Sequence, residues 1–213
     1  NDLEKINTLY GIKIANDLEF AEQCKENGLY TIYLQFDGVE DDSAYKSTRG
    51  VPLWETKKKA IENCRKAGLK VVLVPTLVKT INDNQVGKIL QFAIQNCDVI
   101  SGVSYQPVAF TGRIEEKERL KQRYTLSDLA FDIEKQTGYA KAMEDWYPLS
   151  ITTPYSKFVS KLNDYLTINL SCHSNCGIGT YLLVNRKTKQ AIPITQIIDI
   201  ESMLNDLNEF VKE

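Results

Sequence analysis

The chain has 213 residues, of which 43% are apolar and 25% are charged, and its formal net charge is −2. This composition is typical of a globular protein, and the length suits one domain with an appendage. The near-zero charge gives no reason to expect a nucleic-acid partner. Because no apolar stretch is long enough to span a bilayer, we expect no transmembrane segment, and any membrane contact would be peripheral.

The cysteine content indicates a reducing compartment. The chain contains 5 cysteines, an odd number without the spacing of a disulfide framework. Together with the expected lack of a signal peptide, this favours the cytoplasm.

One sequence unit occurs twice. The first copy is residues 21–34, and the second is residues 61–74, forty positions later. Each copy predicts a helix that ends at a glycine, Gly28 or Gly68, and then leads into a buried strand. Two such copies predict a repeating α/β architecture with parallel strands.

In the first half of the chain, predicted helices alternate with predicted strands. In chain order these are a strand at 9–15, a helix at 18–27 capped by Asn16 or Asp17, a strand at 31–36, a loop at 39–49, a helix at 52–66, a strand at 71–74, a helix at 85–95 and a strand at 99–105. This alternation is typical of a (β/α) barrel or a doubly wound sheet.

The pattern changes after Phe110. The predicted elements are a charged stretch at 113–123, a helix from about 125 to 143, a helix at 155–165, a hairpin of 180–184 with 191–194, and a final helix capped by Asp199. We therefore predict an α/β domain over residues 1–113. Residues 114–213 are predicted to form an appendage of helices and a β-hairpin.

Polar or turn-forming residues follow the predicted strands. These are Gln35, Asp37, Thr76 and Gln106. In parallel α/β folds, ligands bind at the carboxyl ends of strands, where loops converge. The alternative is that these residues only make turns and end the strands, as Asp37-Gly38 could. We predict that these four residues together form the rim of a binding pocket.

The cysteines fall into two kinds. Cys24, Cys64 and Cys97 lie at helix ends, where small buried residues are favoured, and we expect them to pack against the sheet. Cys172 and Cys176 lie four apart in a polar loop that also contains His173, the only histidine. They could ligate a metal or an iron–sulfur cluster, form a disulfide, or remain ordinary thiols. His173 is a candidate ligand or acid–base group, or simply a surface residue.

Two common catalytic motifs are absent from the sequence. No glycine-rich phosphate loop and no Gly-x-Ser-x-Gly motif occurs, which argues against kinase, dehydrogenase and hydrolase functions. The lysine run at 57–59 is predicted to be a solvated helix face.

Several segments, in this order and spacing, resemble a known protein family. They are Tyr-Leu-Gln-Phe-Asp-Gly at 33–38, Thr-Arg-Gly at 48–50, residues 60–69 and 72–76, Gly-Val-Ser-Tyr-Gln-Pro-Val at 102–108, Phe-Thr-Gly-Arg at 110–113, and Cys-His-x-x-Cys-Gly at 172–177. The family is a group of archaeal radical S-adenosylmethionine (SAM) proteins, the tetraether lipid synthase group, whose members are also described as pterin methylases of methanopterin biosynthesis.

The resemblance implies a partial (β/α) barrel with SAM and a [4Fe-4S] cluster at its strand ends. In such enzymes the cluster, supplied with electrons by a donor protein, reduces SAM to a 5′-deoxyadenosyl radical. The implied reaction is C–C coupling of phytanyl chains of archaeal ether lipids. Gln35, Asp37, Thr76 and Gln106 would then form the SAM rim, and Cys172 and Cys176 would ligate an auxiliary cluster.

The chain departs from the family in one respect, because the three-cysteine loop that holds the radical-generating cluster is absent. Residues 1–113 are therefore expected to be the C-terminal half of the barrel. The 213-residue chain alone is expected to be inactive. Two alternatives remain open. One is radical SAM methylation of a dihydropterin, and the other is a non-catalytic α/β binding subunit.

Overall fold

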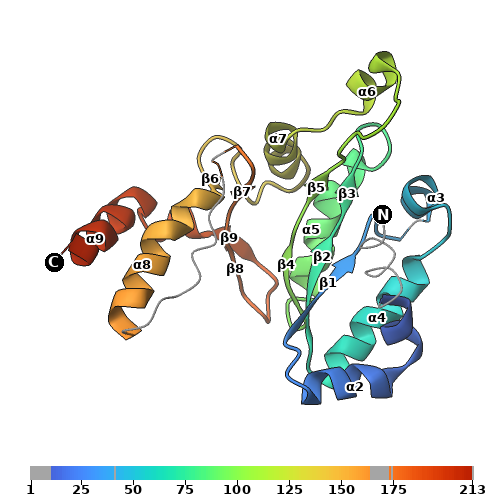
Figure 1. Ribbon diagram of the computed structural model, residues 1–213, viewed down its shortest axis with the longest axis horizontal. Coiled ribbons are helices and arrows are strands. Elements are labelled where there is room, and N and C mark those ends of the chain that lie inside the picture. The colour runs from blue at the N-terminus through green and yellow to red at the C-terminus, as the bar shows by residue number, and fades with distance from the viewer. Residues whose placement is uncertain (1–10, 41, 164–172, 174, 213) are drawn as a thin grey trace. The chain divides into compact units, whose positions relative to one another are not determined.

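A computed structural model describes residues 11–40, 42–163, 173 and 175–212 (Figure 1). The chain divides into two compact units. The first is Asn1–Thr125 with Arg186–Lys189, and the second is Leu126–Asn185 with Gln190–Glu213. The division at residue 113 stays a prediction.

Three strands of the first unit form a parallel sheet in the order β1–β2–β4 (Figure 1). They are β1 (Thr31–Gln35), β2 (Lys70–Val74) and β4 (Ile100–Val103). Two shorter strands, β3 (Thr76–Leu77) and β5 (Gln106–Pro107), pair in parallel just after β2 and β4. Because helices connect the consecutive parallel strands, the predicted α/β class is confirmed. The partial barrel stays a prediction.

Besides a helical segment at residues 11–16, the first unit has helices that precede, connect or follow these strands. They are α2 (Leu18–Glu26), α3 (Ser43–Arg49), α4 (Trp54–Ala67), the 3₁₀ turn η1 (Asp83–Gln85), α5 (Val86–Gln95) and α6 (Glu116–Gln122). The predicted cap of α2 is confirmed, since Asp17 Oδ1 accepts a hydrogen bond from the Phe20 amide at 2.9 Å.

The repeated unit folds the same way in both copies. In the first, the Gly28 and Leu29 amides donate to the carbonyls of residues 25 and 24, and Gly28 has a φ of +90°. In the second, the Gly68 and Leu69 amides donate to the carbonyls of residues 65 and 64, and Gly68 has a φ of +72°. A glycine is favoured here because residues that carry a side chain rarely adopt this left-handed backbone conformation. The two helices pack on each other.

The predicted strand at 9–15 is wrong, because residues 11–16 are helical. Their buried positions are 11, 14 and 15, which is a helical spacing rather than an alternating one. The Asn63 amide nitrogen donates to the carbonyls of Ile14 and Ala15, at 2.8 and 3.2 Å, which satisfies the end of this helix. The isoleucines at 12 and 14 mimic the period of a strand.

The predicted loop at 39–49 is also wrong in its second half, which forms α3. Two of its residues, Ala44 and Tyr45, are buried, and the Tyr45 hydroxyl donates to the Gly38 carbonyl at 3.0 Å. Gly50, with a φ of +77°, ends the helix. Tertiary contacts therefore stabilise a helix of 7 residues that local sequence hardly favours.

Aromatic side chains fill the core between the sheet and its helices. Phe36 stacks on Phe92 with ring centroids 5.3 Å apart, and Trp54 meets both rings edge-on. Ile32 and Leu34 of β1 pack in the same core, so this face of β1 is the helix-covered face.

The second unit contains helices and short antiparallel strand pairs. Its elements are α7 (Leu126–Thr137), β6 (Tyr147–Pro148), η2 (Leu149–Ile151), α8 (Thr152–Asn163), β7 (Ile178–Gly179), β8 (Leu182–Val184), β9 (Ala191–Pro193), η3 (Ile194–Gln196) and α9 (Ile200–Lys212). β6 pairs with β7, and β8 pairs with β9 as the predicted hairpin.

Two further predictions for the second unit have different outcomes. The Asp199 cap of the last helix is confirmed, because its Oδ1 accepts from the Ser202 amide at 3.1 Å. The predicted helix to residue 143 is wrong, because α7 ends at Thr137 and Gly138 follows with a φ of +70°. Across the described residues, no helix combines the length and apolar character that crossing a membrane requires.

The glycine of the repeat can be tested by substitution. We expect Gly68→Ala to destabilise the chain by about 1 to 2 kcal/mol, because the left-handed conformation is strained for alanine. The added Cβ would meet nothing closer than Lys25 Cε at 4.0 Å, so steric overlap contributes little. Urea unfolding measures the difference. Gly102→Ala is the control, because that site has open space and no positive φ, and an equal loss there would contradict the explanation.

Candidate functional site

A buried carboxylate lies just beyond the carboxyl end of β1. Asp37 has no exposed surface, and both of its oxygens accept hydrogen bonds. Oδ2 accepts from Thr48 Oγ1 at 2.6 Å and from Arg49 Nε at 3.0 Å, while Oδ1 accepts from the Thr76 amide at 2.9 Å. The Asp37 charge is therefore paired and hydrogen-bonded, as a buried charge must be.

Arg49 connects this carboxylate to the next strand. Its Nη2 donates to Thr76 Oγ1 at 2.8 Å while its Nε donates to Asp37. The guanidinium thus bridges the residues that follow β1 and β2. Arg49 is the last residue of α3, the helix that the sequence analysis missed, and its side chain is 15% exposed.

A buried asparagine joins the same two chain segments through their backbones. Asn82 Nδ2 donates to the carbonyls of Asp37 and Thr76 at 3.1 and 2.8 Å, and its Oδ1 accepts from the Val78 amide at 2.9 Å. Such a fully hydrogen-bonded network is rigid. We conclude that Asp37, Arg49, Thr76 and Asn82 form one unit, which we call the strand-end network.

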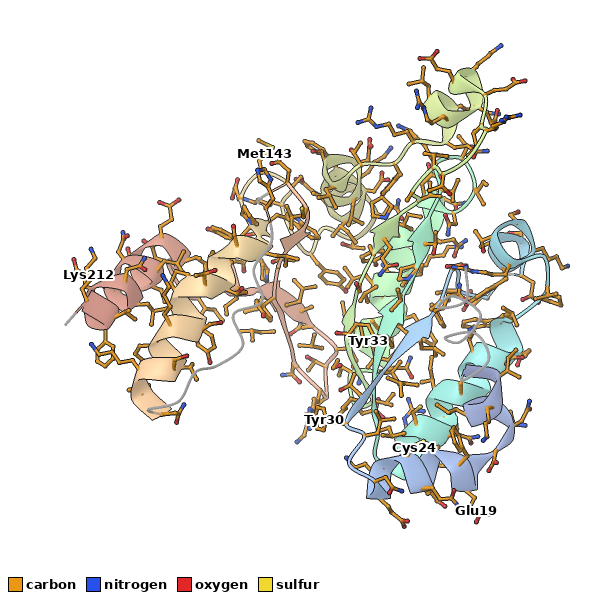
Figure 2. The ribbon with its side chains drawn as sticks, viewed as in Figure 1. Glu19, Cys24, Tyr30, Tyr33, Met143 and Lys212 are labelled. Atoms are coloured by element: carbon orange, nitrogen blue, oxygen red, sulfur yellow. The ribbon has the colours of Figure 1, made fainter. Side chains whose placement is uncertain are left out.

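Gln35 lies beside this network but is not bonded to it. Its side chain is buried, yet neither amide atom has a hydrogen-bond partner in the described part of the chain. By strand alternation Gln35 points away from the helix-covered face that holds Leu34 and Phe36. Tyr33, on the same side of β1, is exposed (Figure 2). A buried amide without partners is costly, so Gln35 is a candidate for meeting a ligand.

The other predicted rim residue, Gln106, lies opposite Thr76 in the β3–β5 pair. Its side chain is exposed, and its amide donates to the Pro75 carbonyl at 2.9 Å. The structure thus brings Asp37 and Thr76 into direct contact. Gln35 is the last residue of β1, and Gln106 lies in β5, opposite Thr76. Their role in ligand binding stays a prediction.

Lys57 is the residue of this region that the sequence analysis misjudged. The run at 57–59 is exposed only at Lys58 and Lys59, and Lys57 has no exposed surface. Its Nζ has no hydrogen-bond partner within the described ranges. The spacing indicates that Lys57 is buried, because it precedes the buried Ala60 and Ile61 by three and four positions and so lies on the same helix face.

Burial lowers the pKa of Lys57 but leaves the side chain charged at neutral pH. It lowers the pKa of the ammonium to about 8 from 10.5. Arg49 lowers this pKa further, whereas the negative charge of Asp37 opposes the shift. The ammonium therefore remains protonated at neutral pH in surroundings that disfavour its charge.

The described cysteines do not form a cluster site. Cys64 is fully buried and its pKa is raised to about 12 by burial, so its predicted packing role is confirmed. Cys24, which lies on α2 (Figure 2), is half-buried, as is Cys97. Cys176 is exposed, and Cys172 lies outside the described residues. Among the residues that are described, no three potential ligands gather around a metal position.

His173 makes only local contacts in the described structure. Its Nδ1 accepts from the Asn175 amide at 3.2 Å, and its carbonyl accepts from the Cys176 amide at 2.8 Å. These bonds link His173 to Asn175 and Cys176. The auxiliary cluster on Cys172 and Cys176 stays a prediction.

The Lys57 charge gives a testable pH dependence. Below pH 8 we expect Lys57→Met to stabilise the chain by on the order of 3 kcal/mol, because it removes a buried charge whose pKa is depressed from 10.5 to about 8. Between these pH values the folded protein has lost the proton that the unfolded chain keeps, so wild-type stability rises with pH. The advantage of the variant should therefore shrink across this window.

Urea unfolding at several pH values measures the effect. Lys58→Met is the control, since that side chain is 43% exposed and pairs with Glu55, and it should show no such window. A stability difference for Lys57→Met that is constant with pH would contradict the assigned charge state.

Comparisons with known proteins agree with the radical SAM resemblance. Residues 8–93 match the model of the Radical SAM superfamily, a range that includes Gln35, Asp37, Arg49 and Thr76. The chain is 45% identical over 204 residues, 95% of its length, to the 7,8-dihydro-6-hydroxymethylpterin dimethyltransferase of Methanocaldococcus jannaschii. That stretch is 40% of the relative, so the chain spans less than half the length of the curated protein it matches. The superfamily match lies within the first unit.

Proposed function

We propose that this chain is part of a radical SAM methyltransferase that acts on a dihydropterin and binds SAM at its strand ends. The observation that carries the proposal is the 45% identity over 204 residues to a 7,8-dihydro-6-hydroxymethylpterin dimethyltransferase. Because the chain covers 40% of that relative, the activity is proposed for the protein that contains it. A one-electron donor protein would be its partner.

The strand-end residues fit SAM by their chemistry. The Gln35 amide offers a buried donor and acceptor without protein partners, which suit the hydroxyls of a ribose. The Arg49 guanidinium suits a carboxylate, and the Thr76 hydroxyl can share a further hydrogen bond. Bound SAM would supply a transferable methyl group and the precursor of a carbon radical. Gln106, which is exposed, would complete the rim.

Asp37 has a different proposed role from the other rim residues. Both of its oxygens are occupied by Thr48, Arg49 and the Thr76 amide, so it has little capacity to bind a ligand as well. We propose that Asp37 positions Arg49 and Thr76 and thereby orients the groups that meet SAM.

An iron–sulfur cluster does not fit the described residues, because the described cysteines do not gather. No step through a cluster is therefore assigned to this chain. Coupling of phytanyl chains rests on the family resemblance alone, whereas methylation of a pterin has the support of the matched relative. The pterin reaction is therefore the preferred proposal.

The binding proposal is tested with S-adenosylhomocysteine as a stable SAM analogue in calorimetric titrations of the chain. We expect Gln35→Ala to weaken binding by about tenfold, because it removes hydrogen bonds worth about 1.4 kcal/mol. Gln23→Ala is the matched control, since Gln23 is exposed on α2 and bonds only to Glu19 through its side chain. Equal affinities for wild type and Gln35→Ala would contradict the proposed role of Gln35.

The substrate is tested with the protein that contains this chain. It is incubated without oxygen with SAM, a one-electron reductant and 7,8-dihydro-6-hydroxymethylpterin, and the products are identified by mass spectrometry. We expect a methylated pterin. Coupled phytanyl chains from an archaeal ether lipid, with no methylated pterin, would favour lipid synthesis instead, and the absence of both products would favour a binding subunit.

A further inference from the structure

Lys57 combines three features that are each unfavourable for a lysine. Its ammonium is fully buried, it has no hydrogen-bond partner among the described residues, and it lies in the first turns of α4, where the helix dipole repels cations. Positions at which a folded sequence breaks several local rules are expected to serve function.

The position of Lys57 relates it to the strand-end network. In an α/β unit the helix after a strand starts at the level where the strand ends, and Lys57 lies three residues after Trp54, the first residue of α4. The surroundings are apolar and close, because a Cβ placed on Gly11 would lie 3.0 Å from Leu34 Cδ1 and 3.5 Å from Lys57 Nζ. The ammonium is thus enclosed beside Gly11 rather than in solvent.

The charges of Lys57 and the network act on each other. Asp37 favours the protonated lysine, and Arg49 disfavours it. The single charge of Asp37 is already paired with Arg49 at 3.0 Å, so Lys57 adds a positive charge that this pair does not neutralise. In a poorly solvated region such a charge acts over several ångströms.

We infer that Lys57 is a positioning residue whose buried positive charge, without touching the ligand, makes the strand ends prefer a ligand that carries a carboxylate. This inference rests on the proposed function, since it concerns the same ligand site. An unneutralised buried charge stabilises an incoming carboxylate, and it gives no such stabilisation to the same ligand without its carboxylate. The cost of burying Lys57 in the free protein is consistent with a role that stability alone does not explain.

The test uses two probes that differ only in the carboxylate, S-adenosylhomocysteine and its decarboxylated form. Calorimetry gives the affinity of the chain for each. We expect wild type to prefer the carboxylate-bearing probe, and Lys57→Met to lower that preference by about tenfold while leaving the affinity for the decarboxylated probe nearly unchanged. Lys58→Met, which removes an exposed lysine from the next position, should behave as wild type.

The outcomes distinguish a failure of the proposed SAM binding from a failure of the proposed role of Lys57. If wild type binds neither probe, the proposed function fails. If wild type binds both probes equally, or if Lys57→Met keeps the wild-type preference, this inference fails and the proposed function stands. If Lys57→Met loses affinity for both probes by the same factor, Lys57 has only a structural role, and the inference is overturned.

Discussion

The structure of the first unit depends on the burial of one carboxylate. Asp37 has no access to solvent, so its charge must be neutralised from within the protein. Thr48, Arg49 and the Thr76 amide meet this need from α3 and from the chain that follows β2. Asn82 joins the same segments through the backbone. The requirement to satisfy Asp37 therefore determines how the ends of the first two strands are arranged.

The repeated helix–glycine–strand unit was predictable from sequence because its causes are local. A glycine in the left-handed conformation, an apolar run and a capping aspartate act over a few residues, and the structure confirms all three. The helix at 11–16 depends on Asn63, 49 positions from Ile14, and the last residue of α3 depends on partners 12 and 27 positions away. Local sequence therefore predicts neither helix. Tertiary contacts override weak local preferences in both places.

The candidate site shows the same division between local and distant causes. The positions of Gln35, Asp37 and Thr76 at strand ends follow from topology, and sequence reasoning could reach them. Arg49 was not among the predicted rim residues because its partners are 12 and 27 positions away in the chain. Lys57 was misjudged because its charge suggested solvent, although its spacing from Ala60 and Ile61 indicated the core. Residues 8–93, the range that matches the Radical SAM superfamily, include Gln35, Asp37, Arg49 and Thr76.

The central claim is that Asp37 and Arg49 act as one buried unit. The most direct measurement is a double-mutant cycle on the free energy of unfolding with Asp37→Asn, Arg49→Met and both changes together. The account predicts a coupling energy of about 2 kcal/mol or more, because each single change leaves a buried partner uncompensated. Additivity to within about 0.5 kcal/mol would contradict it, since independent sites behave in that way.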